Sequence, residues 1–417
     1  MDIQKSNKDL LIQHFKDGIK CICIEKLGVE IEHFIVESKS YEGISYYGEH
    51  GIGSILEELA SYYPNRFEKE GHLIGLYNDD YSISLEPAGQ FEVSINPRER
   101  IDSITEIYQG FLELIDPILQ RYNYELITLG YQPKSKVRDL KLIPKKRYQY
   151  MNHYFETSGT HGIHMMRGTA ATQVAIDYSG EEDFVRKFRA AYTMMPLFSL
   201  LTDNSPVYEG EPYQGRMLRS DIWDNVDKKR TGIIPGLFDE DFGFESYAEY
   251  LMQLPLIFIP KGELAVYTGE STTAQIWENE KISEEDIEHI LSMTFLDVRL
   301  KNYIEIRFAD SMPLIYVLGY LALIKGIFYS DENLNIILEK LKPDEQKIRE
   351  AKASLAKDGF EGIAYGYHAA ELLQDITERA EAQLDPREQA LLAPIKEIIK
   401  NRRTLANKYH EDHFKSI

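Results

Sequence analysis

The sequence predicts an α+β protein in which helices surround an antiparallel sheet with one acidic face. Short β-type patterns follow one another through tight turns between residues 72 and 95, which favours an antiparallel meander over βαβ units. Other segments carry apolar residues at helical spacing. Beyond about residue 330 the pattern is almost entirely helical. We therefore predict a main domain over 1–330 and a helical C-terminal region over 331–417 packed on it.

Helices are expected where apolar residues recur every three or four positions. In 101–122, for example, Ile104, Tyr108, Phe111 and Ile115 form the stripe of a core-facing helix. The predicted helices are 8–20, 51–62, 101–122, 182–201, 314–328 and 386–402. Segment 202–240 is rich in Gly, Pro and Asp and is too long for an idle connection, so we predict a functional loop there.

Strands are expected in shorter segments bounded by Gly, Pro or Asn. They are 28–37, 72–77, 81–86, 89–95, 124–130, 169–178 and 302–309. Four of these strands alternate polar and apolar side chains, so that each has one polar face. The polar positions are Glu30 and Glu32; Gln90, Glu92 and Ser94; Gln173 and Asp177; and Tyr303, Glu305 and Arg307. Glu86 ends strand 81–86, in the turn that leads to Gln90.

An ordinary sheet with a solvated outer face alternates in the same way, and that is the alternative for any one strand. Two features weaken it. The polar faces are dominated by carboxylates, whereas a solvated face mixes charges of both signs, and Glu is a poor strand former. Clustered carboxylates repel one another unless they are protonated or bound to cations. Hard oxygen ligands select Mg²⁺ or Mn²⁺, so the face is a possible platform for a metal–nucleotide complex.

Arginines complement this acidic face. Arg307 shares a face with Glu305, and Arg216, Arg219 and Arg230 lie in a Gly-bracketed segment, 214–232. Guanidinium groups suit carboxylate and phosphate oxygens, although surface charges of a long loop are the alternative for each arginine alone. The sequence contains no GxxxxGK[ST], GxGxxG, CxxC, HExxH or GxSxG motif.

Composition limits the possible partners. The 417 residues include 47 Lys and Arg against 68 Asp and Glu, a net charge of −21, which disfavours nucleic acids and anionic membranes. Small molecules remain, including nucleotides, because bound metal ions reverse a local field. No apolar run approaches the roughly 18 residues of a membrane span, and the only cysteines are Cys21 and Cys23. We expect a soluble cytoplasmic protein, whose oligomeric state the sequence does not specify.

Six segments, in order, resemble glutamate–cysteine ligases of the plant and proteobacterial type. They are 27–34 (LGVEIEHF), 84–94 (SLEPAGQFEVS), 144–148 (PKKRY), 165–177 (MMRGTAATQVAID), 219–232 (RSDIWDNVDKKRTG) and 297–310 (DVRLKNYIEIRFAD). The resemblance implies a glutamine-synthetase-like fold, in which an antiparallel sheet forms a funnel for Mg²⁺ and ATP. It also implies ATP-dependent coupling of the glutamate γ-carboxylate to the cysteine amine, the first step of glutathione synthesis, with residues 1–330 as the catalytic domain.

The resemblance also implies roles for individual residues. It implies metal ligands at Glu30, Glu32, Glu86, Glu92 and Glu305 for Mg²⁺, with Mn²⁺ possible. Arg219 and Arg307 are expected to bind the glutamate carboxylate or the transferred phosphoryl group. Gln173, Lys228 and Arg230 are expected on the nucleotide side, with ATP as co-substrate. Gln90, Trp223 and Tyr303 are expected, together with Arg219, in the substrate pocket.

The sequence departs from the family at three places, and these leave alternatives open. Ala88 stands where the family often has Gly, and 95–97 (INP) replaces a small residue and Gly, so the amine acceptor could differ from cysteine.

A non-catalytic binder of a nucleotide or amino acid is the other alternative. A metal-dependent phosphohydrolase is disfavoured because it would not need the arginine segment. Plant members carry regulatory cysteine pairs, whereas only Cys21 and Cys23 occur here, so we expect no disulfide control.

Overall fold

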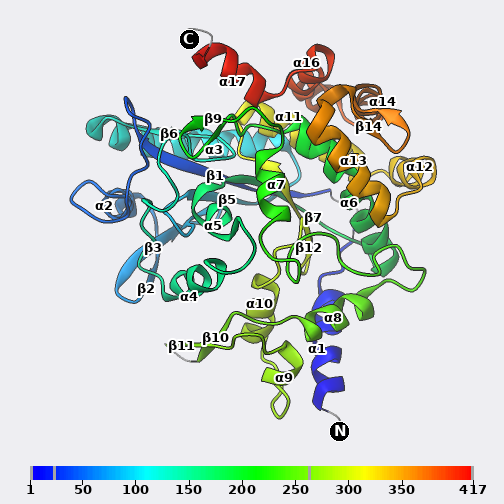
Figure 1. The fold of residues 1–417 in the computed structure, drawn as a ribbon, viewed down its shortest axis with the longest axis horizontal. Helices are drawn as coiled ribbons and strands as arrows, with labels where there is room; N and C mark the ends of the chain where they lie inside the picture. The colour runs from blue at the N-terminus through cyan, green and yellow to red at the C-terminus, as the bar shows by residue number, and fades with distance from the viewer. Residues whose placement is uncertain (1–2, 22–24, 262–263, 415–417) are drawn as a thin grey trace.

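A nine-stranded antiparallel sheet forms the centre of the computed structural model, which describes residues 3–21, 25–261 and 264–414 (Figure 1). Its strands are β1 (Leu27–Glu37), β2 (Asn65–Lys69), β3 (His72–Tyr77), β4 (Tyr81–Leu85), β5 (Phe91–Arg98), β6 (Tyr124–Ile127), β7 (Ala171–Ile176), β12 (Val298–Leu300) and β13 (Ile304–Asp310). The order is β12-β13-β7-β1-β5-β4-β3-β2, and β6 pairs with the end of β1. The predicted α+β class and the antiparallel meander β3–β4–β5 are confirmed.

Helices surround the sheet, and the described connections also contain three small two-stranded hairpins. The helices before residue 330 are α1 (Ile3–Asp17), α2 (Ile52–Leu59), α3 (Ile101–Tyr122), α4 (Lys146–Phe155), α5 (Gly162–Gly168), α6 (Glu181–Leu201), α7 (Leu218–Asp224), α8 (Phe244–Gln253), α9 (Thr273–Ile276), α10 (Glu284–Ser292) and α11 (Leu314–Phe328). The later ones are α12 (Asp331–Leu341), α13 (Glu345–Asp358), α14 (Ala369–Ala382), α15 (Pro386–Leu391), α16 (Ala393–Asn401) and α17 (Leu405–Phe414). The hairpins are β8 (Val207–Tyr208) with β9 (Glu211–Pro212), β10 (Phe258–Lys261) with β11 (Leu264–Tyr267), and β14 (Ile363–Ala364) with β15 (Tyr367–His368).

Most predicted elements are present, and two long helices, α3 and α11, have the predicted bounds. The prediction of one helix over 386–402 is wrong. The chain forms α15 and α16 with a break at Leu392, two residues before Pro394, whose missing N–H cannot continue the hydrogen-bond ladder. The predicted loop 202–240 contains the short helix α7 and the β8–β9 hairpin. Helices α12–α16 pack mainly on α6 and α11, while the boundary at residue 330 stays a prediction.

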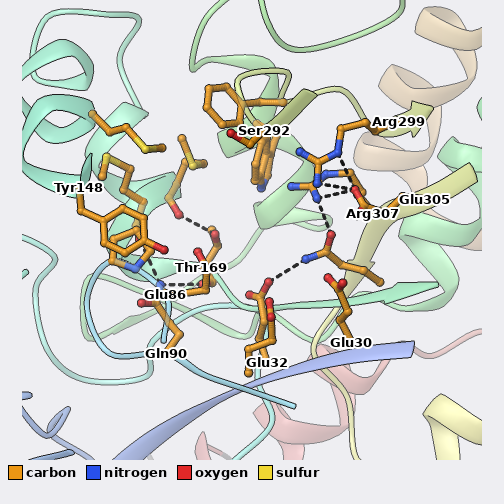
Figure 2. A pocket seen from close by; sticks show the side chains of 18 of the residues that line it. Glu30, Glu32, Glu86, Gln90, Tyr148, Thr169, Ser292, Arg299, Glu305 and Arg307 are labelled. Atoms are coloured by element: carbon orange, nitrogen blue, oxygen red, sulfur yellow. Dashed lines mark hydrogen bonds and ion pairs between the residues drawn. The ribbon is translucent and has the colours of Figure 1, made fainter. Parts of the chain in front are cut away.

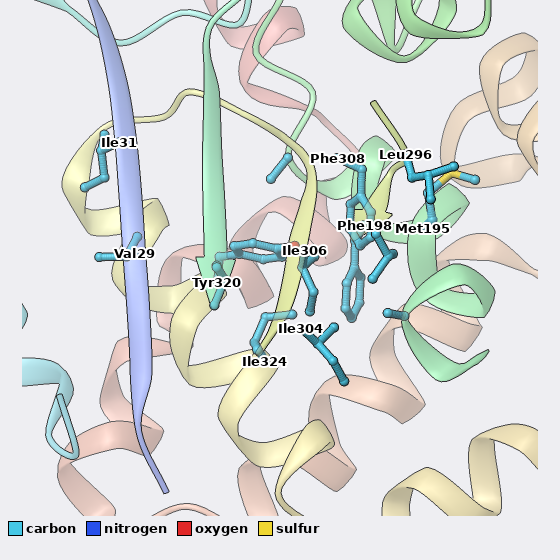
Figure 3. Close-up of a cluster of buried hydrophobic side chains, with 14 of the residues drawn as sticks. Val29, Ile31, Met195, Phe198, Leu296, Ile304, Ile306, Phe308, Tyr320 and Ile324 are labelled. Carbon is cyan, nitrogen blue, oxygen red and sulfur yellow. The ribbon is translucent and has the colours of Figure 1, made fainter. Parts of the chain in front are cut away.

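The apolar face of the sheet packs against α6 and α11 (Figure 3). Val29 on β1 and Ile304 on β13 are at most 1% exposed. Phe308 lies 6.4 Å from Phe198 on α6, and Tyr320 on α11 contacts Phe198 edge-on at 6.0 Å, both measured between ring centroids. Burying each such side chain contributes about 1.5–3 kcal/mol. Because side chains alternate along a strand, this packing fixes the carboxylates on the opposite face.

Within the described ranges, no single helix is long and apolar enough to cross a membrane. Helices α11 and α12 reach that length only together, and they bend by 84° at their break. Most of α11 is buried in the protein core.

Candidate active site

The register of the sheet brings the predicted carboxylates together at its centre. Glu32 on β1 lies directly opposite Glu92 on β5, and Glu30 lies opposite Gln173 on β7. Like charges directly opposite each other destabilise a sheet. Because the pairing of Glu32 with Glu92 costs stability, a role other than holding the fold together is the better explanation for these residues.

A cavity of about 290 Å³ lies over these carboxylates (Figure 2). Ten of the predicted site residues line it: Glu30, Glu32, Glu86, Gln90, Glu92, Gln173, Arg219, Trp223, Glu305 and Arg307. Lys228, Arg230 and Tyr303 lie outside it. Sheet strands form the floor, and α4, α5 and α7 with the β12–β13 hairpin contribute the walls.

One side of the cavity is the acidic wall, which we define as Glu30, Glu32, Glu86 and Glu92. Glu32 accepts hydrogen bonds from the backbone N–H of Ala171 at 2.8 Å and from Gln173 Nε2 at 3.0 Å. Glu92 Oε1 accepts from the hydroxyls of Ser84 and Ser94, at 2.8 and 3.0 Å. These bonds fix the carboxylates in place, but they supply no countercharge.

Burial and mutual repulsion disfavour the ionised forms of these acids. Burial, together with the nearby Glu92 and Glu305, raises the pKa of Glu30 to about 8. Burial, Glu86 and Glu92 raise the pKa of Glu32 to about 8, against the opposing effect of Arg219. The pKa of Glu92 is raised as well, first by burial and then by Glu86. At neutral pH a bound cation would therefore stabilise the ionised carboxylates of this wall.

A tight turn between β4 and β5 carries Glu86, which also lines the cavity. Pro87 occupies the second position of this turn, and Gly89 has a φ of +88°, a conformation that glycine adopts without strain. The Gly89 N–H donates to the Glu86 carbonyl at 2.9 Å. Gln90 stabilises the same turn, because its amide accepts from the Ala88 N–H and donates to the carbonyls of Met166 and Thr169.

The opposite side is the basic wall, which we define as Arg299, Lys301 and Arg307 around Glu305. Arg299 lies directly opposite Glu305 in the β12–β13 hairpin. Nitrogen–oxygen distances from Glu305 are 2.7 Å to Arg299, 2.9 Å to Lys301 and 2.8 Å to Arg307. Burial opposes ionisation of Glu305, but these three cations outweigh it and hold its pKa well below the usual range.

Gln173 connects the two walls. Its Oε1 accepts from Arg307 Nη1 at 2.5 Å, while its Nε2 donates to Glu32. Arg307 reaches this position from a β-bulge, because the register between β13 and β7 shifts between Ile306 and Ala309. Its backbone N–H donates to the Asp297 carbonyl at 3.0 Å. Bulges commonly re-aim a side chain beside an active site.

Helix α7 adds Arg219 and Trp223, which lie one turn apart. The guanidinium carbons of Arg219 and Arg307 lie 5.4 and 5.9 Å from the centroid of the Trp223 ring system, within cation–π range. In the part of the chain that the structure describes, Arg219 Nε, Arg307 Nε and Trp223 Nε1 are buried without a hydrogen-bond partner. Buried donors of this kind are normally satisfied, so an acceptor-rich ligand would complete them.

The remaining predicted residues lie nearby but outside the cavity. Arg230 is fully buried, where it pairs with Asp227 and donates to Tyr154 Oη at 2.9 Å, so it anchors the segment after α7. Lys228 is exposed and lines a separate hollow. Tyr303 lines a smaller hollow of about 220 Å³, which shares Glu30, Gln173 and Glu305 with the main cavity.

Sequence reasoning missed several cavity residues, including Lys145, Arg147, Arg299 and Lys301. Burial lowers the pKa of Lys145 to about 8. The family-like segment 144–148 contains the first two. The alternation in 298–301 (VRLK) before a turn could have placed the other two on the face of Glu305.

The carboxylates are separated between the two walls. Among the residues that the structure describes, no group of three or more His, Cys, Asp or Glu side chains is arranged to hold a metal ion. The donors of the acidic wall still fit a hard divalent cation, because they are all carboxylate oxygens and two have a pKa near 8. Soft-metal ligands are not part of this wall.

Without divalent metal, the protein is expected to lose stability as the pH rises from 6.5 to 8. The pKa of Glu30 and of Glu32 is about 8 in the folded protein against 4.5 normally. The folded state therefore holds protons that the unfolded chain has already released, and stability falls with pH. His33, whose pKa burial lowers to about 4, adds little above pH 6.5.

Thermal melts in EDTA and in Mg²⁺ at both pH values measure this dependence. Mg²⁺ should raise Tm more at pH 8 than at pH 6.5, because bound metal keeps the carboxylates ionised. An Mg²⁺ effect that is equal at the two pH values would contradict the assignment of the acidic wall as a metal site.

Comparison with known proteins identifies the family of this chain. The model of glutamate–cysteine ligase family 2 (GCS2) matches residues 26–411. The chain belongs to this family. The chloroplastic glutamate–cysteine ligase of Arabidopsis thaliana is 31% identical over 91% of this chain and 78% of its own length. Chloroplastic ligase B of Oryza sativa subsp. japonica is 32% identical over 79% of this chain and 68% of its own length.

A solved structure supports the family fold. The crystal structure of glutamate–cysteine ligase from Francisella tularensis in complex with AMP aligns with a TM-score of 0.58 and 13% identity. The alignment covers 95% of this chain and 86% of that one. The predicted family resemblance is thus confirmed. The predicted absence of disulfide control involves Cys23, which lies outside the described residues, and stays a prediction.

Proposed function

We propose that this family member joins the γ-carboxylate of glutamate to the amine of cysteine and converts ATP to ADP and phosphate. The product would be γ-glutamylcysteine, the first intermediate of glutathione synthesis. The observation that carries the proposal is the division of one cavity into an acidic and a basic wall connected by Gln173. A metal-bound polyphosphate and a carboxylate substrate together match such a cavity.

The chemistry requires activation of a carboxylate. An oxygen of a free carboxylate is a poor leaving group, whereas phosphorylation of the γ-carboxylate creates an acyl phosphate that an amine can attack. Transfer of the phosphoryl group needs in-line positioning and neutralisation of the charge on its oxygens. Arg219 and Arg307 have buried donors at the cavity for this task. No covalent enzyme nucleophile is needed.

Glu30, Glu32, Glu86 and Glu92 would hold Mg²⁺, or Mn²⁺ in its place. The metal, when bound, supplies charge neutralisation at the phosphates. Glu305 remains the fifth proposed ligand, although its carboxylate is paired with Arg299, Lys301 and Arg307. Phosphate oxygens that enter the cavity would compete for these cations, and this competition would make Glu305 available to a metal.

The amine of the second substrate must be neutral when it attacks. The groups at the cavity that can accept its proton include the carboxylates of the acidic wall and the phosphate itself. The hollow lined by Tyr303 continues the cavity past Glu30 and Glu305 and offers space for one of the substrates.

The decisive assay combines the purified protein with ATP, Mg²⁺, glutamate labelled with ¹⁸O in the γ-carboxylate, and a panel of amines. With cysteine, we expect γ-glutamylcysteine, ADP and one ¹⁸O atom in each released phosphate. Faster turnover with another amine would identify a related γ-glutamyl ligase. Phosphate release without ligation, or binding without turnover, would reject the ligase proposal.

Removal of divalent metal is expected to abolish ligation. Excess EDTA should reduce the rate of γ-glutamylcysteine formation to background, and Mg²⁺ or Mn²⁺ should restore it. Zn²⁺ should restore it poorly because the proposed ligands are all hard carboxylate oxygens. Full turnover in excess EDTA would exclude a metal role for the acidic wall.

A further inference from the structure

The segment that carries Arg219 and Trp223 is held by the C-terminal helices at three separate points. His410 Nε2 on α17 donates to the Tyr213 carbonyl at 3.0 Å. Arg216 Nη1 donates to the carbonyl of Lys357, near the end of α13, at 2.7 Å. Lys352 Nζ, also on α13, lies 2.6 Å from Asp224 Oδ1 at the end of α7.

Helix α7 depends on such contacts because it is short. It has seven residues, and the residue before it, Met217, has a φ of +55° and no capping side-chain hydrogen bond. A helix of this length has little stability of its own, so tertiary contacts determine its position. Arg219 and Trp223 both lie on this helix and both line the cavity.

Lys352 is a largely buried charged anchor among these contacts. Its side chain is 13% exposed, and its Nζ also lies 3.4 Å from the carbonyl of Ser220, the residue after Arg219. It lines a hollow of about 260 Å³ beneath α7 together with Asp224 and Asp297. The Asp297 carbonyl accepts the backbone N–H of Arg307. Lys352 therefore contacts α7, which carries Arg219, and shares a hollow with Asp297, which holds the backbone of Arg307.

We propose that the C-terminal helices position Arg219 and Trp223 for catalysis, with Lys352 as the positioning residue that joins α13 to α7. The proposal rests on the proposed function for its catalytic consequence. Its structural part, the placement of α7, is independent of the substrates. The C-terminal region is then a support for the site.

The test uses the full chain with Trp277→Phe, which leaves Trp223 as the only tryptophan. In this background, Lys352→Met keeps the length of the side chain and removes its charge. We expect kcat/KM for glutamate to fall about 10- to 100-fold, as for a displacement of about 1 Å. We also expect the emission of Trp223 to shift to the red and acrylamide quenching to increase. Lys352→Arg should restore both properties in large part.

Lys340→Met is the matched control. Lys340 forms an ion pair of 2.8 Å with Asp375 within the C-terminal region and does not line the hollow beneath α7. This variant should match the parent in rate and emission. If Lys352→Met fails to fold, Asp224→Asn tests the same contact from the side of α7.

A double variant tests whether Lys352 acts through Asp224. If it does, Lys352→Met with Asp224→Asn should be no worse than the more damaged single variant, since the pair acts as a unit. Additive losses, or a fall in rate with unchanged Trp223 emission, would overturn the positioning role. If the parent ligates no amine, the proposed function fails, whereas the emission of Trp223 still decides whether Lys352 places α7.

Discussion

Glu30→Gln is expected to reduce kcat for ligation by about three orders of magnitude and to raise the Tm of the metal-free protein at pH 8. The rate falls because the amide loses the negative charge proposed to hold Mg²⁺. Tm rises because the variant no longer has to bury an ionised carboxylate near Glu92 and Glu305. Activity and stability therefore change in opposite directions, which a mere folding defect would not produce.

Steady-state kinetics at saturating Mg²⁺ and melts in EDTA measure both effects. Glu125→Gln is the matched control, because Glu125 is exposed on β6 of the same sheet. It should change neither property appreciably. A Glu30→Gln enzyme with a near-normal rate would remove Glu30 from the site, and a lower Tm in EDTA would show that its carboxylate stabilises the fold.

Arg307→Ala is expected to lower kcat by about 10²- to 10³-fold with a small change in KM for ATP. Arg307 contacts Gln173 and Glu305 and has a buried Nε without a partner among the described residues. If it stabilises charge that develops on the transferred phosphoryl group, its loss costs about 3–4 kcal/mol in the transition state. A rise in KM for ATP at constant kcat would instead place Arg307 in ground-state binding of the nucleotide.

Arg307→Lys separates charge from geometry. Lysine keeps the positive charge but lacks the planar fork, so we expect it to recover only part of the lost rate. Arg66→Ala serves as the control, since Arg66 pairs with Glu57 and Glu68 on the protein surface. Full activity in Arg307→Lys would show that a point charge suffices.

The floor of the cavity was predictable because a strand alternates its side chains. From the period of two alone, Glu30, Glu32, Glu92 and Glu305 could each be assigned to the polar face of its own strand, and the burial of Ile304 on the other face agrees. Helices α3 and α11 were predictable as well, since each carries a long apolar stripe or a continuous apolar run.

The basic wall was not predictable to the same depth. β12 has only three residues, so the alternation in 298–301 is short, and the pairing of Arg299 with Glu305 depends on the register of β12 with β13. The bulge at Arg307 changes the register without a glycine to mark it. For Arg230 the sequence suggested a ligand contact, because it is an arginine in a loop. In the structure its side chain is buried and paired with Asp227.

The topology of the sheet also has a consequence for the order of folding. β1 lies at the centre between β5 and β7, while β13 reaches its place beside β7 only after most of the chain has been synthesised. A nascent chain that ends before β12 contains the whole acidic wall and none of the basic wall. Contacts between such distant segments form slowly. The cavity is thus among the last parts to assemble, and fragments that end before β12 should not be expected to fold into a stable unit.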